Sequence, residues 1–428
     1  MEIFRFRFFL FSLSLFLFCC SSPVEEKIKL TGDPNNAGLN LPEGFTAMIV
    51  ADEIGRARHL TVNSNGDIYV MLRSLNSGGG IAGLRDTDGD GRADIIRYFG
   101  DLPGTGIEIR NGYLYFASDT SIYRYKLNGK DLIPQEDPEP IVSGFIFQRQ
   151  HAVKPFTFDD QGNMYVNVGA PSNACQEQDR TKDSPGMDPC PLLERQGGIW
   201  RFEADKLGQK QIDNGYQFAT GIRNSVAINW NQNSKKLYAL QHGRDMLSIL
   251  HPELYTDEQS AELPSEEFLL VEDGSDFGWP FCYYDHFQSK KLLNPEYGGD
   301  GKITGRCDDV DKPIMAFPGH YAPNDLIFYQ GDHFPADYKY GAFIAFHGSW
   351  NRAPLEQKGY HVVFVPFDGE LPADDWTVFA DDFAGVKPIM SPSDAYHRPV
   401  GLAEGPDGSL YVSDSQGGRI YRIFYNEL

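Results

Sequence analysis

The sequence predicts an all-β protein folded as a six-bladed propeller, and three observations carry that prediction. Aromatic residues make up 13% of the 428 residues, with 30 Phe and 22 Tyr, and aromatic side chains favour strands. The 44 Gly and 27 Pro are spread along the chain without a fixed period, as in a protein with many tight turns. Six segments share one pattern, in which an alternating apolar stretch, a turn and a short aromatic-rich strand follow one another.

The repeated segments run along the whole chain, and each is expected to form a β-hairpin because turn residues such as Asn-Gly or Asp-Gly separate two alternating stretches. They are residues 57–70, 106–125, 156–166, 226–240, 326–346 and 400–412. Their central aromatic residues are Tyr69, Tyr115, Tyr165, Tyr238, Phe343 and Tyr411. The first gaps of about 45 to 50 residues match one four-stranded blade. Later gaps are longer and hold cysteines, which predicts long loop insertions on one face. Two stacked β-sandwiches are the alternative, but they would not require one recurring unit.

The first residues are predicted to be an export signal of the lipoprotein type, spanning 1–20. Two arginines precede the apolar run 8–18, which is too short for a membrane-spanning helix. The run ends at two cysteines, of which Cys20 is the expected lipid acceptor and the one contact with a membrane. An ordinary cleaved signal peptide is the alternative. Residues 21–40 would then be a flexible tether and 41–428 the propeller, exported to the periplasm or cell envelope.

Four further cysteines suit an exported chain, because disulfides persist in oxidising compartments. Cys175 and Cys190 lie 15 residues apart, and Cys282 and Cys307 lie 25 apart. Two local disulfides are the simplest expectation, although four cysteines allow three pairings. A zinc site is less favoured because these cysteines lack Cys-x-x-Cys spacing.

The net charge of −22 excludes some classes of partner. Phosphate neutralisation needs clustered Lys and Arg, so a nucleic-acid-binding function is not expected. Docking on anionic lipid through a basic face is disfavoured for the same reason.

One local motif has the spacing of a calcium loop. Its carboxylates stand at positions 1, 3, 5 and 9, with Gly91 at position 6, and belong to Asp86, Asp88, Asp90 and Asp94. Position 12 is Arg97 instead of the bidentate Glu, which excludes an EF-hand. We expect a shorter loop that binds a structural calcium ion, with an unmetallated Asp-Gly turn as the alternative.

A second set of candidate residues is dispersed through the chain, beside four of the predicted hairpins. It consists of His151, Arg223, Asn224, His347, Trp350, Arg352 and Arg398. Loops that enter the innermost strands of a propeller converge at one mouth of its channel, so these side chains are expected to meet there. A ring of cations at a channel favours a polyanionic ligand.

Several motifs together resemble the PQQ-dependent sugar dehydrogenase family, in its soluble glucose dehydrogenase or sorbosone dehydrogenase-like branch. The motifs are Arg223-Asn-Ser-Val-Ala, Phe277-Gly-Trp-Pro, Ala322-Pro, His347-Gly-Ser-Trp-Asn-Arg and Arg398-Pro-Val-Gly-Leu. The resemblance covers the chain from about Leu41 to its C-terminal end, and it implies a six-bladed propeller that uses PQQ and calcium.

The resemblance also implies roles for individual residues. His151 stands where the general base takes the hydroxyl proton of the substrate while hydride passes to the quinone. Arg223 and Asn224 match the pair that contacts the quinone oxygens. Arg398 matches an arginine that binds a PQQ carboxylate, and either Arg352 or Lys358 would supply a further cation.

Further positions follow from the same resemblance. The backbone carbonyls of Gly243 and Arg244 match the loop that holds calcium against PQQ. Tyr321 and Trp350 would form walls of the substrate cleft, with His347 beside the cofactor. The chain departs from the family at 169–175, where soluble glucose dehydrogenases carry acidic and glutamine side chains, and at 103–106, which lacks a glutamine that contacts the cofactor.

The sequence thus predicts a PQQ- and calcium-dependent dehydrogenase that oxidises an aldose or a sugar aldehyde. Its electron acceptor would be external, a cytochrome or a quinone, because the chain has no Cys-x-x-Cys-His haem attachment site. A calcium-dependent lactonase is one alternative, although its chemistry needs carboxylates around a channel metal. A non-catalytic propeller that binds carbohydrate or protein is the other.

Overall fold

The structure is a computed structural model that describes residues 1–3 and 30–426. The predicted export signal with Cys20, and residues 21–29 of the predicted tether, lie outside the described residues. In the part of the chain that the structure describes, no helix has the length and apolar character needed to span a membrane.

The first three blades follow the predicted hairpins in order. Blade 1 contains β2 (Ala57–Val62), β3 (Ile68–Asn76), β4 (Gly79–Arg85) and β5 (Ile95–Phe99). Blade 2 contains β6 (Ile107–Arg110), β7 (Tyr113–Ala117), β8 (Ile122–Lys126) and β9 (Glu139–Ser143), extended by β13 (Gln209–Lys210). Blade 3 contains β10 (Phe156–Phe158), β11 (Asn163–Val168), β12 (Gly198–Glu203) and β14 (Tyr216–Thr220), extended by β18 (Ser275–Asp276).

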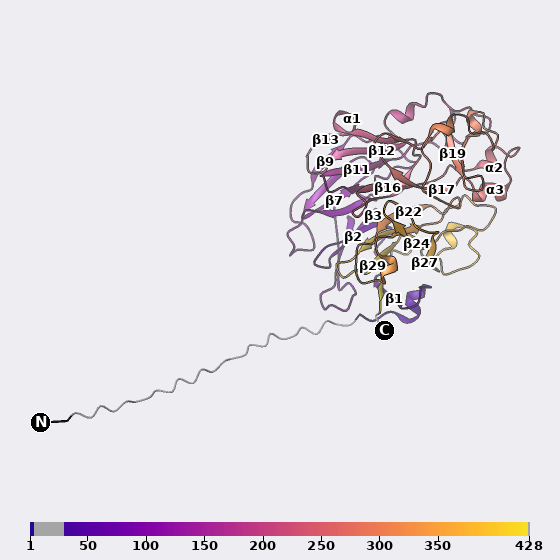
Figure 1. Ribbon diagram of the computed structural model, residues 1–428. Coiled ribbons are helices and arrows are strands. Elements are labelled where there is room, and N and C mark those ends of the chain that lie inside the picture. Colours follow the sequence, from indigo (N-terminus) through magenta and orange to yellow (C-terminus); the bar gives the residue numbers. More distant parts are fainter. Residues whose placement is uncertain (4–29, 427–428) are drawn as a thin grey trace.

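The last three blades complete the ring (Figure 1). Blade 4 contains β15 (Ser225–Asn231), β16 (Lys236–Gln241), β17 (Glu266–Val271) and β21 (Met315–Phe317). Blade 5 contains β22 (Pro323–Phe328), β23 (Ala342–Phe346), β24 (His361–Val365) and β27 (Thr377–Ala380). Blade 6 contains β28 (Pro399–Glu404), β29 (Leu410–Asp414) and β30 (Ile420–Tyr425), and its outermost strand is the N-terminal β1 (Phe45–Ala51).

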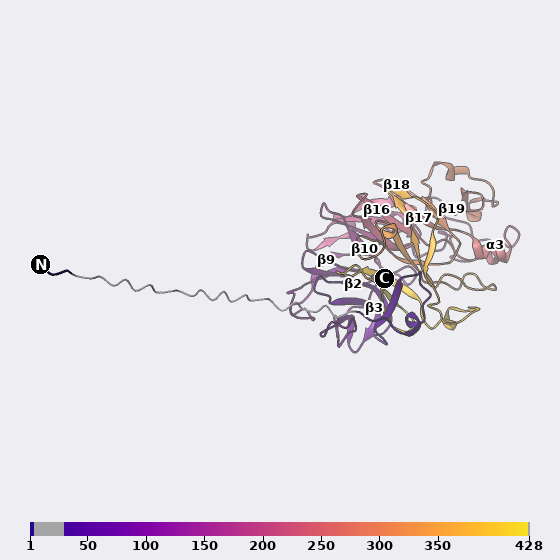
Figure 2. The same ribbon diagram turned by 60° about the horizontal axis from the view of Figure 1, so that its bottom comes forward.

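Two features confirm a propeller and exclude stacked sandwiches. The first strands of all six blades line one shared cavity of about 170 Å³, which is the central channel. Strand β1 pairs antiparallel with β30, from Phe45 opposite Tyr425 to Ala51 opposite Ile420, so the N-terminal strand closes the ring against the C-terminal one (Figures 1 and 2).

The core lies between the blades. Each of six buried apolar clusters spans two consecutive blades, and together they close a circle. The predicted central aromatic residues are all buried in these clusters, at 4% exposure or less. Tyr115, for example, packs edge-on against Phe158 of the next blade, at 4.8 Å between ring centroids. The aromatic repeat therefore reflects the need of each sheet to cover its neighbour's face.

The turn chemistry explains why the hairpins form where the sequence predicts them. Asn111 and Gly112, between β6 and β7, have φ of 51° and 77°, as a two-residue turn with both central residues left-handed requires. Between β10 and β11, the Asp159 carboxylate accepts the backbone N–H groups of Gln161 and Asn163, and Gly162 has a φ of 90°.

Both local disulfides are present, as predicted, and each lies in a long connection. Cys175–Cys190 lies between β11 and β12, together with the short helix η2 (Pro191–Glu194). Cys282–Cys307 lies between β17 and β21, where β19 (Cys282–Asp285) pairs with β20 (Lys290–Leu293).

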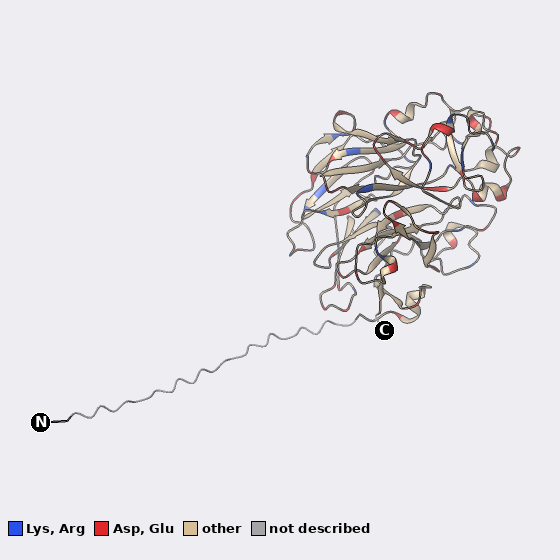
Figure 3. Ribbon diagram, in the orientation of Figure 1, with Lys and Arg blue, Asp and Glu red and all other residues tan. Residues whose placement is uncertain are grey.

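Short elements complete the connections, and several gather at one edge of the molecule. In Figure 1, β19 lies beside the labels of α2 (Leu247–Leu250) and α3 (Asp257–Glu262). The other short elements are α1 (Gln211–Asn214), β25 (Phe367–Asp368), β26 (Leu371–Pro372), η1 (Pro34–Gly38), η3 (Pro295–Tyr297), η4 (Gly305–Asp309), η5 (Ala336–Tyr338) and η6 (Pro392–Asp394). Acidic and basic positions are interspersed over the blades in Figure 3.

Residues 30–40 pack against the propeller. Asp33 accepts from Arg92 at 2.7 Å, and Leu39 is buried in the cluster between blades 5 and 6. Asn40 forms an antiparallel bridge with Asp381.

Candidate functional site

Strand direction decides which loops meet. In an antiparallel blade, the connection into the first strand and the connection from second to third strand lie at the same end. A cavity of about 260 Å³ opens at this end and is lined only by residues from such connections and from the strand ends beside them. Its lining is Gln150, His151, Arg180, Arg223, His242, Gly243, Asp245, Glu266, His320, Ala322, Ser349, Trp350 and Asn351.

Backbone strain gathers in this lining. His151, Arg180, His320 and Ala322 all have a φ between 50° and 66°, a left-handed conformation that costs a residue with a Cβ about 1–2 kcal/mol. Such conformations persist only where surrounding contacts enforce them, and they are typical of functional sites.

His151, in the connection from β9 to β10, is held in one orientation. Gln148 donates from Nε2 to the carbonyls of Gln150, His151 and Gly169, at 2.8 to 2.9 Å. The Nδ1 atom of His151 lies 2.5 Å from the Ala170 carbonyl, which can only accept, so Nδ1 carries the proton. The Nε2 atom is therefore the basic nitrogen. A Cβ at Gly169 would lie 2.8 Å from the His151 Cβ, so glycine permits this close packing.

Arg223 and Asp245 form the charged centre of the cavity wall. Arg223, between β14 and β15, is 2% exposed and donates from Nη2 to the Asp245 carboxylate at 2.6 Å. Its Nη1 donates to the Gly243 carbonyl at 2.7 Å. Asp245 also pairs with Arg180 and accepts from Asn351 Nδ2 at 2.6 Å. Burial disfavours the charged carboxylate, but the Arg223 and Arg180 guanidinium groups hold the pKa of Asp245 well below its usual range.

Two histidines of the cavity, His151 and His242, and the carboxyl group of Glu266 are neutral at pH 7. Burial, and secondarily the charge of Arg223, lower the pKa of His151 to about 3. Burial lowers the pKa of His242 to about 4 and raises the pKa of Glu266 to about 8. Glu266 still accepts the backbone N–H groups of Gly243 and Ala322, at 3.0 Å each.

A cationic cluster lies on the neighbouring blades 6 and 1. Arg398 donates from Nη2 to His347 Nδ1 at 2.9 Å and to the Gly348 carbonyl at 2.6 Å, and His347 Nε2 contacts Ser415 Oγ at 2.7 Å. Arg58 donates to Thr105 Oγ1 at 3.1 Å. Burial, then the charges of Arg73 and Arg398, lower the pKa of Arg58 to about 10. Among the described residues, no carboxylate forms an ion pair with Arg58 or Arg398.

The predicted site residues divide among three places. His151, Arg223, Gly243 and Trp350 line the cavity, with Asn224 next to Arg223. Arg398 belongs to the cationic cluster, and His347 accepts a hydrogen bond from it there. Arg352 spends its donors on the Ala261 and Gly319 carbonyls, the Glu356 carbonyl and Glu262, so it serves the packing of blade 5. Tyr321 and Lys358 line a separate cavity of about 190 Å³, between residues 356–361 and residues 381–389.

The sequence reasoning missed the acidic partner of Arg223. Asp245 directly follows Gly243-Arg244 in the sequence, so its position was the available signal. Six further residues of the site were not predicted from the sequence. Five of them belong to no local motif, and the sixth, Asn351, lies inside the His347–Arg352 motif. The five are Arg58, Arg180, His242, Glu266 and His320.

The unpaired polar atoms and the free guanidinium groups fit a polar, anionic cofactor such as PQQ. Asn224 Oδ1, Asn351 Oδ1 and Arg223 Nε are buried without a hydrogen-bond partner among the described residues, and such atoms call for a bound group. Two guanidinium groups without carboxylate partners lie on the adjacent blades and suit the carboxylates of PQQ.

The calcium position expected at Gly243 and Arg244 fits less well. The Gly243 carbonyl already accepts from the Arg223 guanidinium, whose positive charge would repel a cation there. The Arg244 side chain is buried against Glu296 and takes no part in the cavity. We derive no step through calcium at this loop.

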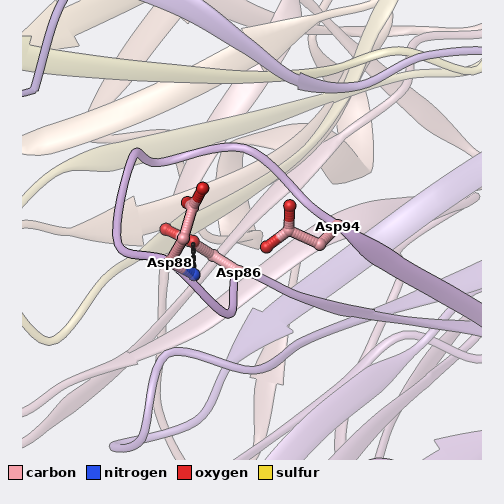
Figure 4. Close-up of side chains that lie close together, drawn as sticks. All are labelled: Asp86, Asp88 and Asp94. Carbon is pink, nitrogen blue, oxygen red and sulfur yellow. Dashed lines mark hydrogen bonds between the residues drawn. The ribbon is translucent and has the colours of Figure 1, made fainter.

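The predicted calcium loop lies on the opposite face, because residues 86–94 connect β4 to β5. Asp86, Asp88 and Asp94 offer one carboxylate oxygen each within 4.8 Å of one another (Figure 4). Asp90 is outside this group, and its Oδ1 accepts the Arg92 N–H at 2.8 Å. Within residues 1–3 and 30–426, this is the single group of three His, Cys, Asp or Glu side chains arranged closely enough to hold a metal ion.

Comparison with known proteins shows the family to which the chain belongs. A family model described as TrAA12-like matches residues 39–426. The chain belongs to the TrAA12-like family. Among curated relatives of this TrAA12-like protein, a pyrroloquinoline quinone-dependent pyranose dehydrogenase from Coprinopsis cinerea is 26% identical over 52% of this chain. An uncharacterised protein from Borreliella burgdorferi is 29% identical over 49% of it. The matches span 34% and 49% of those relatives, respectively.

Solved structures share the fold of the TrAA12-like protein. The holo form of the pyranose dehydrogenase PQQ domain from Coprinopsis cinerea aligns with a TM-score of 0.71 at 20% identity, covering 90% of this chain and 97% of that one. A calcium structure of Trichoderma reesei family AA12 aligns at 0.72 and 16%, covering 94% and 99%. PQQ-bound aldose sugar dehydrogenase from Streptomyces coelicolor aligns at 0.54 and 17%, covering 90% and 99%. These names agree with the family that the motifs resemble.

Proposed function

We propose that the protein is a PQQ-dependent oxidoreductase that oxidises a sugar or a sugar aldehyde and passes the electrons to an external acceptor. One observation carries the proposal: a histidine with a fixed tautomer and a buried guanidinium face the same cavity, at the mouth of a propeller channel. The family membership and the names of the relatives support the same chemistry.

His151 is suited to be the base. With its proton on Nδ1, held by Ala170, it offers the Nε2 lone pair to a substrate hydroxyl. Its low pKa reflects burial and the charge of Arg223. An anionic ligand beside Arg223 would offset that charge and raise the pKa of His151 toward the range in which a base is effective.

Arg223 is suited to stabilise negative charge on an oxygen. Asp245 and the Gly243 carbonyl fix the guanidinium plane, which removes the entropy cost of orienting it during the reaction. The unpaired Nε of Arg223 and Oδ1 of Asn224 are the polar atoms left for a ligand.

The cofactor would be held by this chain's own charges. Arg58 and Arg398 would bind its carboxylates, and Trp350, which is 50% exposed, would cover the cavity from the 347–360 loop. When bound, PQQ would supply a quinone that accepts two electrons from the substrate in the form of one hydride.

The setting of the protein is part of the proposal. Two disulfides suit an oxidising compartment, in line with export to the periplasm or cell envelope and lipid attachment at Cys20. The acceptor would be a cytochrome or a quinone. A structural calcium ion at Asp86, Asp88 and Asp94 is proposed separately from the redox site, since that loop lies on the other face.

The alternatives make different demands on the cavity. A calcium-dependent lactonase needs metal-ligating carboxylates at the channel mouth. The described lining there offers two carboxyl groups, of which Asp245 is already paired with two arginines and Glu266 accepts the backbone N–H groups of Gly243 and Ala322. A non-catalytic propeller would not need a strained, oriented histidine.

Reconstitution tests the proposal. Protein from about Lys27 onward is titrated with PQQ, followed by absorbance, and dye reduction is then measured with a panel of aldoses and sugar aldehydes. Saturable binding with sugar-dependent dye reduction is the expected result. Arg58→Gln is expected to weaken PQQ binding about tenfold or more, since a charge-assisted hydrogen bond is lost, whereas the matched surface variant Arg97→Gln is not. Folded protein that binds no PQQ would contradict the proposal.

A further inference from the structure

Arg180 reaches the cavity from the connection between β11 and β12, which the Cys175–Cys190 disulfide closes. Its backbone is left-handed, with a φ of 54°, and its N–H is held by Gln176 Oε1 at 3.0 Å. Arg180 is thus held in a strained conformation by its own connection, and it lines the cavity that contains the candidate base His151. This placement suits contact with a ligand.

The Arg180 guanidinium has donors to spare. Its Nη1 donates to Gln150 Oε1 at 2.5 Å and to Asp179 Oδ2 at 3.1 Å, and its Nη2 pairs with Asp245. These three bonds leave two of its five N–H groups without an acceptor in the described part of the chain. The side chain is 23% exposed, in contrast to the 3% of Arg223, so the free donors are open to a ligand.

A buried amide, that of Asn173, fixes the backbone of Asp245, whose carboxylate pairs with both arginines. Asn173 Oδ1 accepts the Asp245 N–H at 2.8 Å and Arg223 Nη2 at 3.2 Å, and its Nδ2 donates to the Asp245 carbonyl at 3.0 Å. Trp279, from the second disulfide-bearing connection, donates to the Asn173 carbonyl at 2.9 Å. The two insertions therefore hold Arg180 and Arg223 in one frame.

The charges of this frame cancel. Arg180 and Arg223 contribute two positive charges, and Asp179 and Asp245 two negative ones. The cavity histidines are neutral, and Glu266 is protonated at pH 7. A charged group on a sugar would therefore find no uncompensated opposite charge among these four side chains, whereas a sugar hydroxyl group can accept hydrogen bonds from the free N–H groups of Arg180.

We propose that Arg180 is a specificity-determining residue that donates hydrogen bonds to a hydroxyl group of a neutral sugar, which makes neutral sugars, and not sugar acids, the substrate class. The proposal rests on the proposed function for its view of the cavity as a substrate site. Selection among sugars would then depend on the β11–β12 connection, which carries Arg180, and not on the base His151.

The test compares Arg180→Gln and Arg180→Lys with wild type, and Arg306→Gln is the matched control. Arg306 also lies in a disulfide-bearing connection and also pairs with an aspartate, Asp188, but it is exposed outside the cavity. Binding of D-glucose, D-galactose, D-mannose and D-glucuronate to PQQ-free protein is measured by calorimetry. PQQ affinity and, in loaded enzyme, KM and kcat are measured separately.

Wild type is expected to bind at least one neutral hexose more tightly than D-glucuronate. Arg180→Gln should weaken that binding, and raise KM, by about 10- to 100-fold, the worth of a charged hydrogen bond, with PQQ affinity and kcat within about threefold. Arg180→Lys should recover part of the loss, and Arg306→Gln should change nothing.

Three results would overturn the proposal. They are preferred binding of D-glucuronate, no neutral hexose bound by folded wild type, or unchanged KM and sugar affinity in Arg180→Gln. Failure of wild type to bind PQQ would instead refute the proposed function, and the sugar titration of PQQ-free protein keeps the two failures apart.

Discussion

The two candidate ligand sites lie on opposite faces of the propeller and differ in how they are built. The Asp86–Asp94 loop is local, its candidate metal-ligating carboxylates are partly or fully exposed, and its oxygens cap the loop's own backbone. The cavity at the channel mouth draws on blades 3, 4 and 5 and on the connections into them, buries its charges and strains its backbone. A local site needs only a loop of the right sequence, whereas the cavity requires several blades to be in place, and only the cavity gains the pKa shifts that acid–base chemistry uses.

Removal of the base should have the largest effect on turnover. His151→Ala is expected to lower kcat by about 10²- to 10⁴-fold, the usual contribution of a positioned proton acceptor, while PQQ affinity stays within about threefold. Steady-state kinetics on reconstituted enzyme measure it. His333→Ala is the control, because that ring accepts the Tyr425 N–H outside the cavity. Full activity in His151→Ala would remove the residue from the mechanism.

Loss of the buried anion should have the next largest effect, now on stability. Asp245→Asn leaves the buried Arg223 guanidinium without a carboxylate and Arg180 with Asp179 alone, so the free energy of unfolding should fall by about 3–5 kcal/mol. Asp205→Asn is the matched control, since Asp205 also pairs with two arginines but is 55% exposed, and it should cost less than about 1 kcal/mol. Urea unfolding compares them. Equal decreases in the unfolding free energy of Asp245→Asn and Asp205→Asn would show that burial of the cavity charges does not increase their effect on stability.

The unfolding free energy should depend on pH because burial shifts the pKa values of several groups at the cavity face and in the channel. His59, His151, His242 and His361 have a pKa of about 3 to 4, against about 6.5 when unfolded. The unfolded chain therefore binds more protons than the folded chain, and these groups lower the unfolding free energy as pH falls from about 6.5 to 4.

Three buried carboxyl groups act in the opposite sense. Glu108, Glu266 and Asp325 have pKa values of about 8, raised by burial, so the folded chain holds protons that the unfolded chain loses above about pH 4.5. Each group of either set changes the unfolding free energy by about 1.4 kcal/mol per pH unit within its titration range. Because they oppose one another between about pH 4.5 and 6.5, stability should be nearly level there and fall on both sides. A steady rise from pH 6 to 8 in urea unfolding would contradict these shifts.

The Asp86–Asp94 loop should give the smallest effect. Calcium at about 100 times its Kd would raise the unfolding free energy of wild type by about 2.7 kcal/mol, and less at lower occupancy. Asp88→Asn should abolish the rise without changing kcat, since the loop is on the far face. Asp300→Asn is the control, because Asp300 also caps backbone N–H groups of its own turn. Thermal unfolding with calcium or EDTA measures both, and loss of activity in Asp88→Asn would break the separation of the two sites.

The parts of the molecule that sequence predicts well are those with local causes. Period-two alternation and turn chemistry such as Asn111-Gly112 placed the hairpins, and the spacing of the cysteines favoured the disulfides that form. The order of the blades then followed from the repeat. The N-terminal strand β1 was not assigned to blade 6, because its partner β30 lies at the other end of the chain.

The cavity was only half predictable, for the same reason. His151 and Arg223 stand beside hairpins, so topology brought them together, but Asp245 gains its role from Asn173, 72 residues away, and Asn351, 106 residues away. Arg352 and Lys358 were predicted to bind the cofactor, but neither lines the cavity. The sequence of a loop does not determine the direction in which each of its side chains points. Arg352 is turned to the Ala261 and Gly319 carbonyls instead.

A crystal structure of the protein with PQQ would show directly whether the cavity is the cofactor site. We expect PQQ in the cavity that contains His151 and Arg223, with its carboxylates on Arg58 and Arg398. Density for PQQ at the opposite face, or a refined cavity that stays free of PQQ in crystals of folded protein at saturating cofactor, would contradict it.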